Sequence, residues 1–219
     1  MTTTPKKSYS ISARSFLPEE RALETLSQAA KDCEGCGLYK IGTQTVFGAG
    51  PPQAHLMFVG EQPGDQEDRQ GHPFVGPAGR ILDKALSEAG ISRHDTYVTN
   101  AVKHFKWIWR GKKRLHQKPS IREVMACKPW LDAEIDAVRP EIIVCMGATA
   151  AQAVLGRPVP ITKERGKFIQ SESGLLTLVT IHPSAIYRRR EKDEQEQEYR
   201  RFAAEIKLAQ QKLQRMKRD

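Results

Sequence analysis

Four short segments that we interpret as strands, the first of them an apolar run that ends in glycine, constrain the fold of this chain more than any other feature. They span residues 55–60, 96–100, 141–147 and 175–181. Apolar runs of this length are typical of strands that are buried on both faces. Helix-like segments lie between them, such as residues 79–89, which stop at Gly90, and a segment that begins with the capping pair Ser120 and Glu123.

Strands that alternate with helices predict an α/β fold with three layers, α/β/α, around a central, mostly parallel sheet of four strands. A length of 219 residues suits one domain with a single large core. We expect residues 1–18 to form a flexible N-terminal arm and residues 19–219 to form the domain, with a first helix at about residues 18–30. A charged C-terminal helix from residue 191 carries an apolar stripe that predicts core packing: Phe202, Ile206, Ala209, Leu213 and Met216.

The carboxyl ends of the predicted strands carry side chains that are able to do chemistry. In sheets of this kind, ligands bind at that edge. The residues that follow or end the strands there are Glu61, Asn100, Gly147 and His182. Each alone is compatible with an ordinary surface loop, but together they predict a crevice.

The charge of the chain favours a polyanionic partner, because its formal net charge is +9. Lys and Arg are dense in residues 103–118, where Trp107 and Trp109 lie among them, and again at residues 188–190. A basic segment alone could be a solvated face. Rings among the cations favour nucleic acid, since rings stack on bases while cations neutralise phosphates.

The hydropathy pattern gives no sign of a membrane or a secretory segment. No apolar run reaches the roughly 18 residues that a membrane span needs. The N-terminal residues lack the apolar stretch of a signal peptide. We therefore expect a cytoplasmic protein with no membrane partner.

The chain has four cysteines, Cys33, Cys36, Cys127 and Cys145. In a protein expected in the cytoplasm they favour a metal site over disulfides. A close pair with two distant single cysteines leaves zinc, redox-active thiols and an iron–sulfur cluster open. Cys145 lies within a predicted strand, so a buried core residue is an alternative for that position.

One group of motifs is far more specific than these patterns. It consists of the Cys33/Cys36 pair, GEQPG at 60–64, PFVGPAG at 73–79, YVTNAVKHF at 97–105, KKRLHQKPS at 112–120, MGATA at 146–150 and IHPS at 181–184. With these motifs the chain resembles the uracil-DNA glycosylase superfamily over residues 33–184, in particular its iron–sulfur family 4 and the DNA-cross-linking subgroup called UdgX. Gln62 and His116 point to the subgroup, because ordinary family 4 enzymes usually have alanine at the first position and lack the basic loop with its histidine.

The resemblance implies a pocket for a uracil nucleotide flipped out of the DNA stack, as chemistry on a base requires. Phe74 would stack on the uracil and Asn100 would read its edge, with Gln62 in the same substrate-binding set. From the residues alone, a core phenylalanine and a strand-end asparagine are ordinary. His182 would donate a hydrogen bond to uracil O2 as negative charge builds on the departing base, although a surface histidine before a helix would look the same.

His116 has the most specific implied role. After the base leaves, the sugar cation is a strong electrophile, and a neutral imidazole near C1′ would attack it and form a stable covalent bond. Glu61 would orient the imidazole, accept its proton or offset the sugar charge, and Asp65 would support that network or position a water. Arg114 would hold a phosphate and fix the loop. The alternative is that His116 is one more polar residue in a DNA-contacting loop.

The resemblance also implies a [4Fe–4S] cluster held by the four cysteines, in a structural role. The partner would be uracil-containing DNA, single-stranded and in some cases duplex, bound by a monomer, with Ile186 as an apolar wedge in the minor groove. Two further interpretations stay open. One is an ordinary multiple-turnover family 4 glycosylase with water as nucleophile, and the other is a non-catalytic module that binds uracil or abasic DNA.

Overall fold

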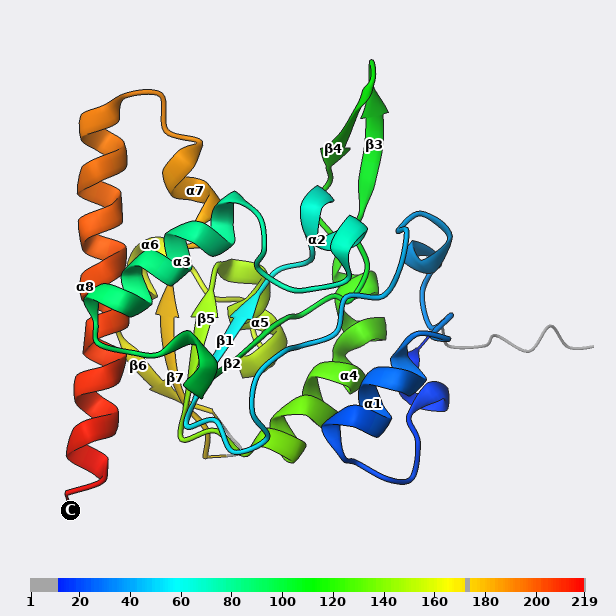
Figure 1. The fold of residues 1–219 in the computed structure, drawn as a ribbon, viewed down its shortest axis with the longest axis horizontal. Coiled ribbons are helices and arrows are strands. Elements are labelled where there is room, and N and C mark those ends of the chain that lie inside the picture. Colours follow the sequence, from blue (N-terminus) through cyan, green and yellow to red (C-terminus); the bar gives the residue numbers. More distant parts are fainter. Residues whose placement is uncertain (1–11, 172–173, 219) are drawn as a thin grey trace, which may run out of the picture.

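The computed structural model describes residues 12–171 and 174–218, and it contains a five-stranded central sheet (Figure 1). The strand order is β2-β1-β5-β7-β6. The strands are β1 (Leu56–Gly60), β2 (Thr96–Asn100), β5 (Ile142–Met146), β6 (Phe168–Gln170) and β7 (Leu176–Thr180). Four of them are parallel, and β6 pairs antiparallel with β7 at one edge. The predicted strands and the α/β class are confirmed, and the sheet has one strand more than expected.

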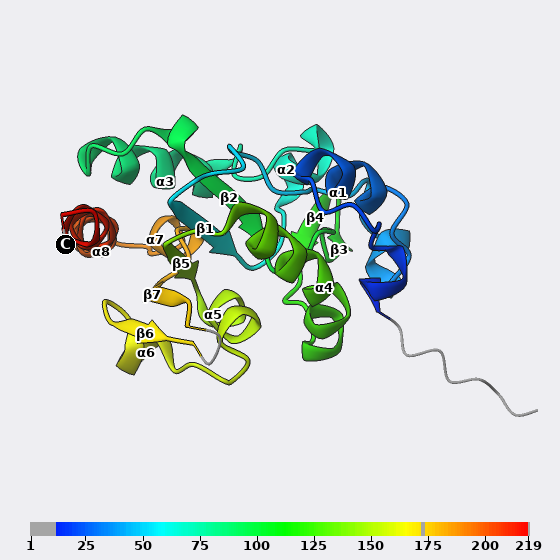
Figure 2. The same ribbon diagram turned by 90° about the horizontal axis from the view of Figure 1, so that it is seen from below.

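Two hydrophobic cores lie on the two faces of this sheet, because successive side chains of a strand point to opposite faces. On one face, Met57 and Val59 pack with the helices α1 (Leu23–Ala30), α4 (Ile121–Val138) and α5 (Ala148–Leu155). On the other, Phe58 packs with α3 (Pro77–Glu88) and α8 (Lys192–Met216). The three-layer arrangement is visible when the molecule is seen from below (Figure 2).

The remaining short helices connect these layers. They are α2 (Asp65–Gln70), α6 (Ile161–Glu164), α7 (Ser184–Tyr187) and the 3-10 helices η1 (Ala13–Phe16), η2 (Gly37–Lys40) and η3 (Arg93–Asp95). In the described part of the chain, no helix is both long and apolar enough to cross a membrane.

The N-terminal region differs in part from expectation. Most of the predicted arm, residues 1–11, lies outside the described residues, but η1 is ordered and Ala13 is buried in the core. The first helix begins at Leu23 instead of near residue 18, with Ala22 in extended backbone at its N-cap. In the C-terminal stripe, Met216 is exposed, whereas the four other predicted residues are buried.

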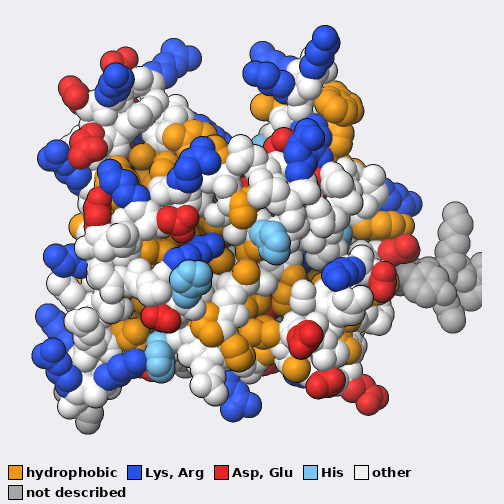
Figure 3. Space-filling model, in the orientation of Figure 1, with side chains coloured by type: hydrophobic (Ala, Val, Ile, Leu, Met, Phe, Trp, Pro, Cys, Tyr) orange, Lys and Arg blue, Asp and Glu red, His pale blue; other side chains and the backbone are white. Residues whose placement is uncertain are grey.

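The expected basic loop at residues 103–120 is largely a β-hairpin. Strands β3 (Trp107–Arg110) and β4 (Lys113–His116) pair antiparallel, with Trp107 opposite His116. The hairpin projects from the body of the molecule, and the turn between α7 and α8 projects on the same side but at the opposite corner (Figure 1). Lys and Arg side chains gather at the tips of both projections (Figure 3). The predicted capping box is confirmed, since the Glu123 N–H donates to Ser120 Oγ and the Ser120 N–H to Glu123 Oε2.

Candidate active site

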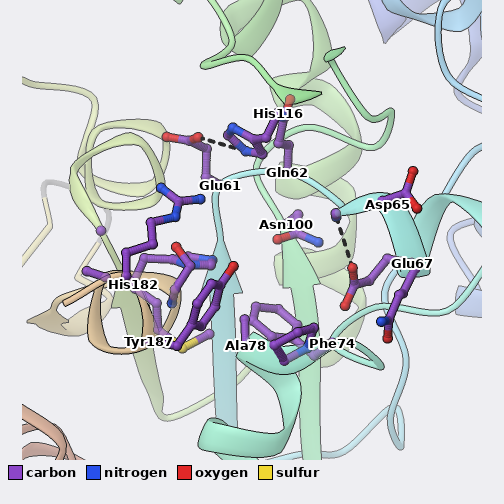
Figure 4. A pocket seen from close by; sticks show the side chains of 18 of the residues that line it. Glu61, Gln62, Asp65, Glu67, Phe74, Ala78, Asn100, His116, His182 and Tyr187 are labelled. Atoms are coloured by element: carbon purple, nitrogen blue, oxygen red, sulfur yellow. Dashed lines mark hydrogen bonds and ion pairs between the residues drawn. The ribbon is translucent and has the colours of Figure 1, made fainter. Parts of the chain in front are cut away.

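A cavity of about 490 Å³ lies at the carboxyl ends of the parallel strands. The four residues expected to outline a crevice all line it: Glu61, Asn100, Gly147 and His182. Gln62, Asp65, Phe74, His116 and Arg188 line it as well. Figure 4 shows Phe74 on one side of the cavity and His116 with Glu61 on the other, with Asn100 between them. A sheet edge and a hairpin therefore supply one common site.

The floor of the cavity is formed by close approach of side chains to Gly60, the last residue of β1. A Cβ at this position would lie 2.4 Å from Asn100 Oδ1 and 2.7 Å from Phe74 Cζ, so only glycine leaves the space open. Asn100 is 2% exposed, and its Oδ1 has no hydrogen-bond partner among the described residues. A buried acceptor without a partner is costly. A ligand with an N–H group would satisfy it.

Phe74 is held in an unusual backbone conformation, with φ at +57°. Left-handed backbone costs a residue with a side chain about 1–3 kcal/mol, and such strain is typical of ligand sites. Helix α3 packs directly against this turn, and a Cβ at Gly79 would lie 1.8 Å from Phe74 O. The ring of Phe74 lies 6.2 Å from that of His182, with the two planes 30° apart. This geometry presents the flat face of a ring to the cavity.

His182 is a neutral hydrogen-bond donor in this environment. Burial lowers its pKa to about 4, and the nearby charges of Arg188 and His116 add to the decrease. The backbone N–H of Ser184 donates to His182 Nδ1 at 3.1 Å. The proton of the neutral ring therefore resides on Nε2, the atom that lies 3.4 Å from the Cβ position of Gly60.

His116 and Glu61 form a polar pair at the rim of the cavity. His116 Nε2 lies 3.6 Å from Glu61 Oε1, and the Thr149 hydroxyl donates to Glu61 Oε2. Burial lowers the pKa of His116, Glu61 raises it, and Arg188 lowers it; the net effect is a decrease. The imidazole is therefore predominantly neutral at pH 7, which leaves a ring nitrogen with a free electron pair.

Gln62, expected in the substrate-binding set, lines the cavity and also bonds to the backbone of the hairpin. Its side-chain amide donates to the carbonyls of Lys106 and Gln117, at 3.2 and 3.0 Å, and accepts from the Lys106 N–H. These two residues flank the β3–β4 hairpin. Gln62 therefore fastens both ends of the hairpin that carries His116, and its amide groups are used by the protein itself.

Arg114 and Asp65 also hold the hairpin. The Arg114 guanidinium bonds to carboxylate oxygens of Asp65 and Asp68, and its side chain is only 7% exposed. Asp68 also accepts from the Thr43 N–H and hydroxyl. These contacts agree with the expectation that Arg114 fixes the loop. They do not favour the expected contact between Arg114 and a phosphate, because two carboxylates already neutralise the charge of the guanidinium. Asp65 also pairs with Arg69 and does not join the Glu61–His116 pair.

The prediction that Ile186 acts as an apolar wedge in the minor groove is wrong. It is 4% exposed and packs in the core with α3 and α8. The neighbouring Tyr187 is exposed and lines the cavity instead.

A model of the uracil DNA glycosylase superfamily matches residues 47–207 of this chain. This range contains every cavity residue described above. The chain belongs to the uracil-DNA glycosylase superfamily.

Several proteins that this chain resembles are type-4 uracil-DNA glycosylases. The chain is 38% identical to the type-4 uracil-DNA glycosylase of Thermotoga maritima over 172 residues, which cover 78% of this chain and 86% of that protein. It is 35% identical to the type-4 enzyme of Sulfurisphaera tokodaii over 172 residues, 75% of each chain. It is 32% identical to that of Archaeoglobus fulgidus over 189 residues, which cover 83% and 92%.

Three of the four cysteines form one group in this superfamily member. Burial raises the pKa of Cys127 to about 12, and the nearby Cys36 and Cys33 add to the increase. N–H groups surround these thiols: Trp130 Nε1 donates to Cys33 Sγ at 3.1 Å, and the Lys103 N–H donates to Cys127 Sγ at 3.2 Å. Donors of this kind stabilise thiolates.

Cys145 stands apart from that group. It lies in the middle of the sheet on β5, opposite Val59 and Val179, and burial alone raises its pKa. Among the described residues, no three His, Cys, Asp or Glu side chains are arranged to hold a metal ion. The described residues therefore do not bring the four cysteines together as a metal site, and their role as ligands stays a prediction.

Lys103 and Glu134 form a buried ion pair that sequence reasoning missed. Lys103 is 1% exposed and bonds to Glu134 of α4, which is fully buried. Lys103 Nζ also donates to Thr99 Oγ1 at 2.7 Å and to the Asn100 carbonyl at 2.8 Å. The pair fixes the end of β2, and with it the position of Asn100.

Glu67 is a second residue that sequence reasoning missed. Its carboxylate accepts from the N–H of Gly64 at 3.1 Å and from that of Gly76 at 2.7 Å. It thus joins the GEQPG and PFVGPAG turns across the mouth of the cavity. The signal was its spacing of three residues from Gly64, which is that of a capping box.

Proposed function

We propose that this protein excises uracil from DNA and then becomes covalently linked through His116 to C1′ of the abasic site. The observation that carries this proposal is the position of a neutral imidazole, paired with Glu61, at the rim of a cavity whose floor presents an unpaired amide oxygen. The type-4 relatives support the first step. The second step, which is that of the UdgX subgroup, rests on the hairpin and its histidine.

In the first step, the flipped uracil enters the cavity and stacks on Phe74. Asn100 Oδ1 accepts the uracil N3–H, which satisfies the buried acceptor. The bond between C1′ and N1 of uracil breaks, and its electron pair leaves with the base. His182 donates its Nε2–H to uracil O2 and stabilises the negative charge that develops there.

In the second step, a ring nitrogen of His116 donates its electron pair to the C1′ cation and forms a C–N bond. The positive charge then resides on the imidazole, whose other nitrogen releases its proton. Glu61 lies close enough to stabilise the imidazolium or to receive this proton. Because an imidazole is a poor leaving group compared with an ester, the product persists and the protein acts once.

The proposed substrate is uracil-containing DNA, with single-stranded DNA preferred over duplex DNA. The protein would bind it as a monomer. For the iron–sulfur cluster that the resemblance implies, we propose Cys33, Cys36 and Cys127 as residues that hold it in a structural role. Their mutual influence and their N–H donors support this set. No step of the reaction passes through the cluster.

The test is incubation with a uracil-containing oligonucleotide, followed by a denaturing gel and the mass of the product. We expect a protein–DNA species that survives denaturation and whose mass equals protein plus abasic DNA. The His116→Ala variant should form none, while uracil release continues. Free protein after complete uracil release by the wild type would favour a multiple-turnover glycosylase with water as nucleophile, which the type-4 relatives also support. No uracil release by the wild type would overturn the proposal.

A further inference from the structure

The tip of the β3–β4 hairpin exposes large apolar side chains that contact little else. Trp109 is 64% exposed, and Ile108 and Leu115, which lie opposite each other, are also exposed. Trp107, in contrast, is anchored to the body of the protein, because its indole N–H donates to the Ile41 carbonyl at 3.0 Å. The Trp107 ring packs edge-on against that of Trp109, with centroids 4.8 Å apart. Trp107 is thus anchored to the protein and supports an exposed neighbour.

The same tip carries positive charge without any compensating carboxylate. Residues 96–122 contain no Asp or Glu. In this segment the ion pairs of the described residues involve Lys103, Lys106, Arg114 and His116, and the exposed Arg110, Lys112 and Lys113 take part in none. Figure 3 shows these basic side chains beside an apolar surface at the end of the projection. An apolar ring among free cations is complementary to a base next to phosphates.

The hairpin also fixes where such a ring lies relative to the reaction. His116 faces Trp107 across the hairpin, and Arg114 faces Trp109. Trp109 therefore lies two residue pairs farther along the hairpin than His116, about 7 Å along the strand. A DNA strand whose uracil enters the cavity has its neighbouring nucleotides within reach of this position.

We propose that Trp109 stacks on the base of a nucleotide adjacent to the target uracil, while the basic tip of the hairpin binds the phosphates of the same strand. This inference rests on the proposed function, because it needs DNA in the cavity. The hairpin then has two functions: its base delivers the imidazole, and its tip binds the flanking DNA. Single-stranded DNA fits this arrangement, since its bases are free to leave their neighbours and stack on a side chain.

The test combines protein variants with oligonucleotides that lack one base. The target carries 2′-fluoro-2′-deoxyuridine, whose fluorine suppresses base loss, so that the equilibrium Kd is measurable. Trp109→Ala should raise the Kd for single-stranded DNA about 5- to 100-fold, the range for loss of one base–aromatic stack. Trp109→Phe should restore most of the affinity. Met216→Ala, at the far end of α8, is the matched control, and its Kd should equal that of the wild type.

Removal of the stacked base from the DNA should produce the same loss in the wild type. A tetrahydrofuran nucleotide is placed directly 5′ or directly 3′ of the target, one side at a time. On one of the two sides, the tetrahydrofuran nucleotide should raise the Kd of the wild type but leave the Kd of Trp109→Ala nearly unchanged. The reason is that the missing base and the missing indole remove the same contact. Additive losses on both sides, or a Trp109→Ala variant that binds like the wild type, would overturn the stacking proposal. Uracil release by the wild type from ordinary deoxyuridine oligonucleotides is measured in parallel, so that failure of the proposed function is recognised separately.

Discussion

His116 Nε2 and Glu61 Oε1 lie 3.6 Å apart, although the two residues come from separate parts of the fold. Glu61 follows β1 at the rigid edge of the sheet, and His116 ends the second strand of a projecting hairpin. The side chains that we propose bind the base, Phe74, Asn100 and His182, all belong to the body of the domain. The proposed reaction thus divides into base release by the body and sugar capture by the hairpin, and the two steps are separable by mutation.

The pH dependence of cross-linking should report the ionisation of His116. Because only the neutral imidazole attacks, the rate should be high above the lowered pKa of His116 and should fall as the pH decreases through it. Glu61 raises this pKa. Glu61→Gln should therefore shift the acid limb to lower pH, because the raising effect of the carboxylate on the pKa of His116 is lost. The measurement is the adduct rate against pH, and an unshifted or oppositely shifted limb contradicts the pairing. Asp132→Asn, on the exposed side of α4, is the control.

Gln62→Ala should impair capture more than excision. The variant loses three hydrogen bonds that fasten the hairpin. At about 0.5–1.5 kcal/mol for each bond, the adduct rate should decrease roughly 10- to 1000-fold. Uracil release depends on the body of the domain and should change far less. The ratio of released uracil to adduct in single-turnover reactions measures this difference, and an equal decrease in both would place Gln62 in base binding after all.

The salt dependence of DNA binding should distinguish Arg114 from its neighbour Lys112. Arg114 is neutralised by Asp65 and Asp68, whereas Lys112 is exposed and has no ion pair with a described residue. Each phosphate contact in single-stranded DNA contributes about 0.7 to the slope of log K against log salt. Lys112→Gln should reduce the slope by about that amount, and Arg114→Gln should leave it unchanged. A reduced slope for Arg114→Gln would restore its expected role at a phosphate.

The iron content of cysteine variants should distinguish Cys145 from the three cysteines that we propose hold the cluster. Cys36→Ala should lose iron and acid-labile sulfide, because Cys36 belongs to the group with Cys33 and Cys127. Cys145→Ala should keep both, with a modest loss of stability from the small cavity in the sheet. Metal analysis and visible absorbance of the purified proteins measure this. Equal loss of iron from the two variants would show that Cys145 is a ligand.

Much of the fold was predictable because the signals were local. Strands β1 and β5 are fully buried and have continuous apolar sequences, and the capping box of α4 is complete within four positions. Strand β6 was missed because it has three residues, which are only partly buried and resemble a loop. The hairpin was read as a loop because its exposed faces carry the charged residues that loops also carry.

The site residues were predictable where their place at the end of a strand was sufficient to bring them to the cavity. They were not predictable where their role depends on a contact with a residue that is distant in the sequence. Asn100 and His182 follow strands, so the topology alone brought them together. Gln62 and Arg114 were assigned to the substrate because their partners, the backbone of Lys106 and the carboxylate of Asp68, become neighbours only in the folded chain. The burial of Ile186 was unpredictable for the same reason, because its side chain packs in a core formed by helices that are distant in the sequence.

The buried pair of Lys103 and Glu134 has a consequence for motion. Any local opening that separates β2 from α4 would leave a bare charge in an apolar interior, which costs several kcal/mol. The segment that ends in Asn100 should therefore exchange its amide hydrogens only when the whole domain unfolds. Asn100 should therefore keep its place at the floor of the cavity during faster local motions of the chain.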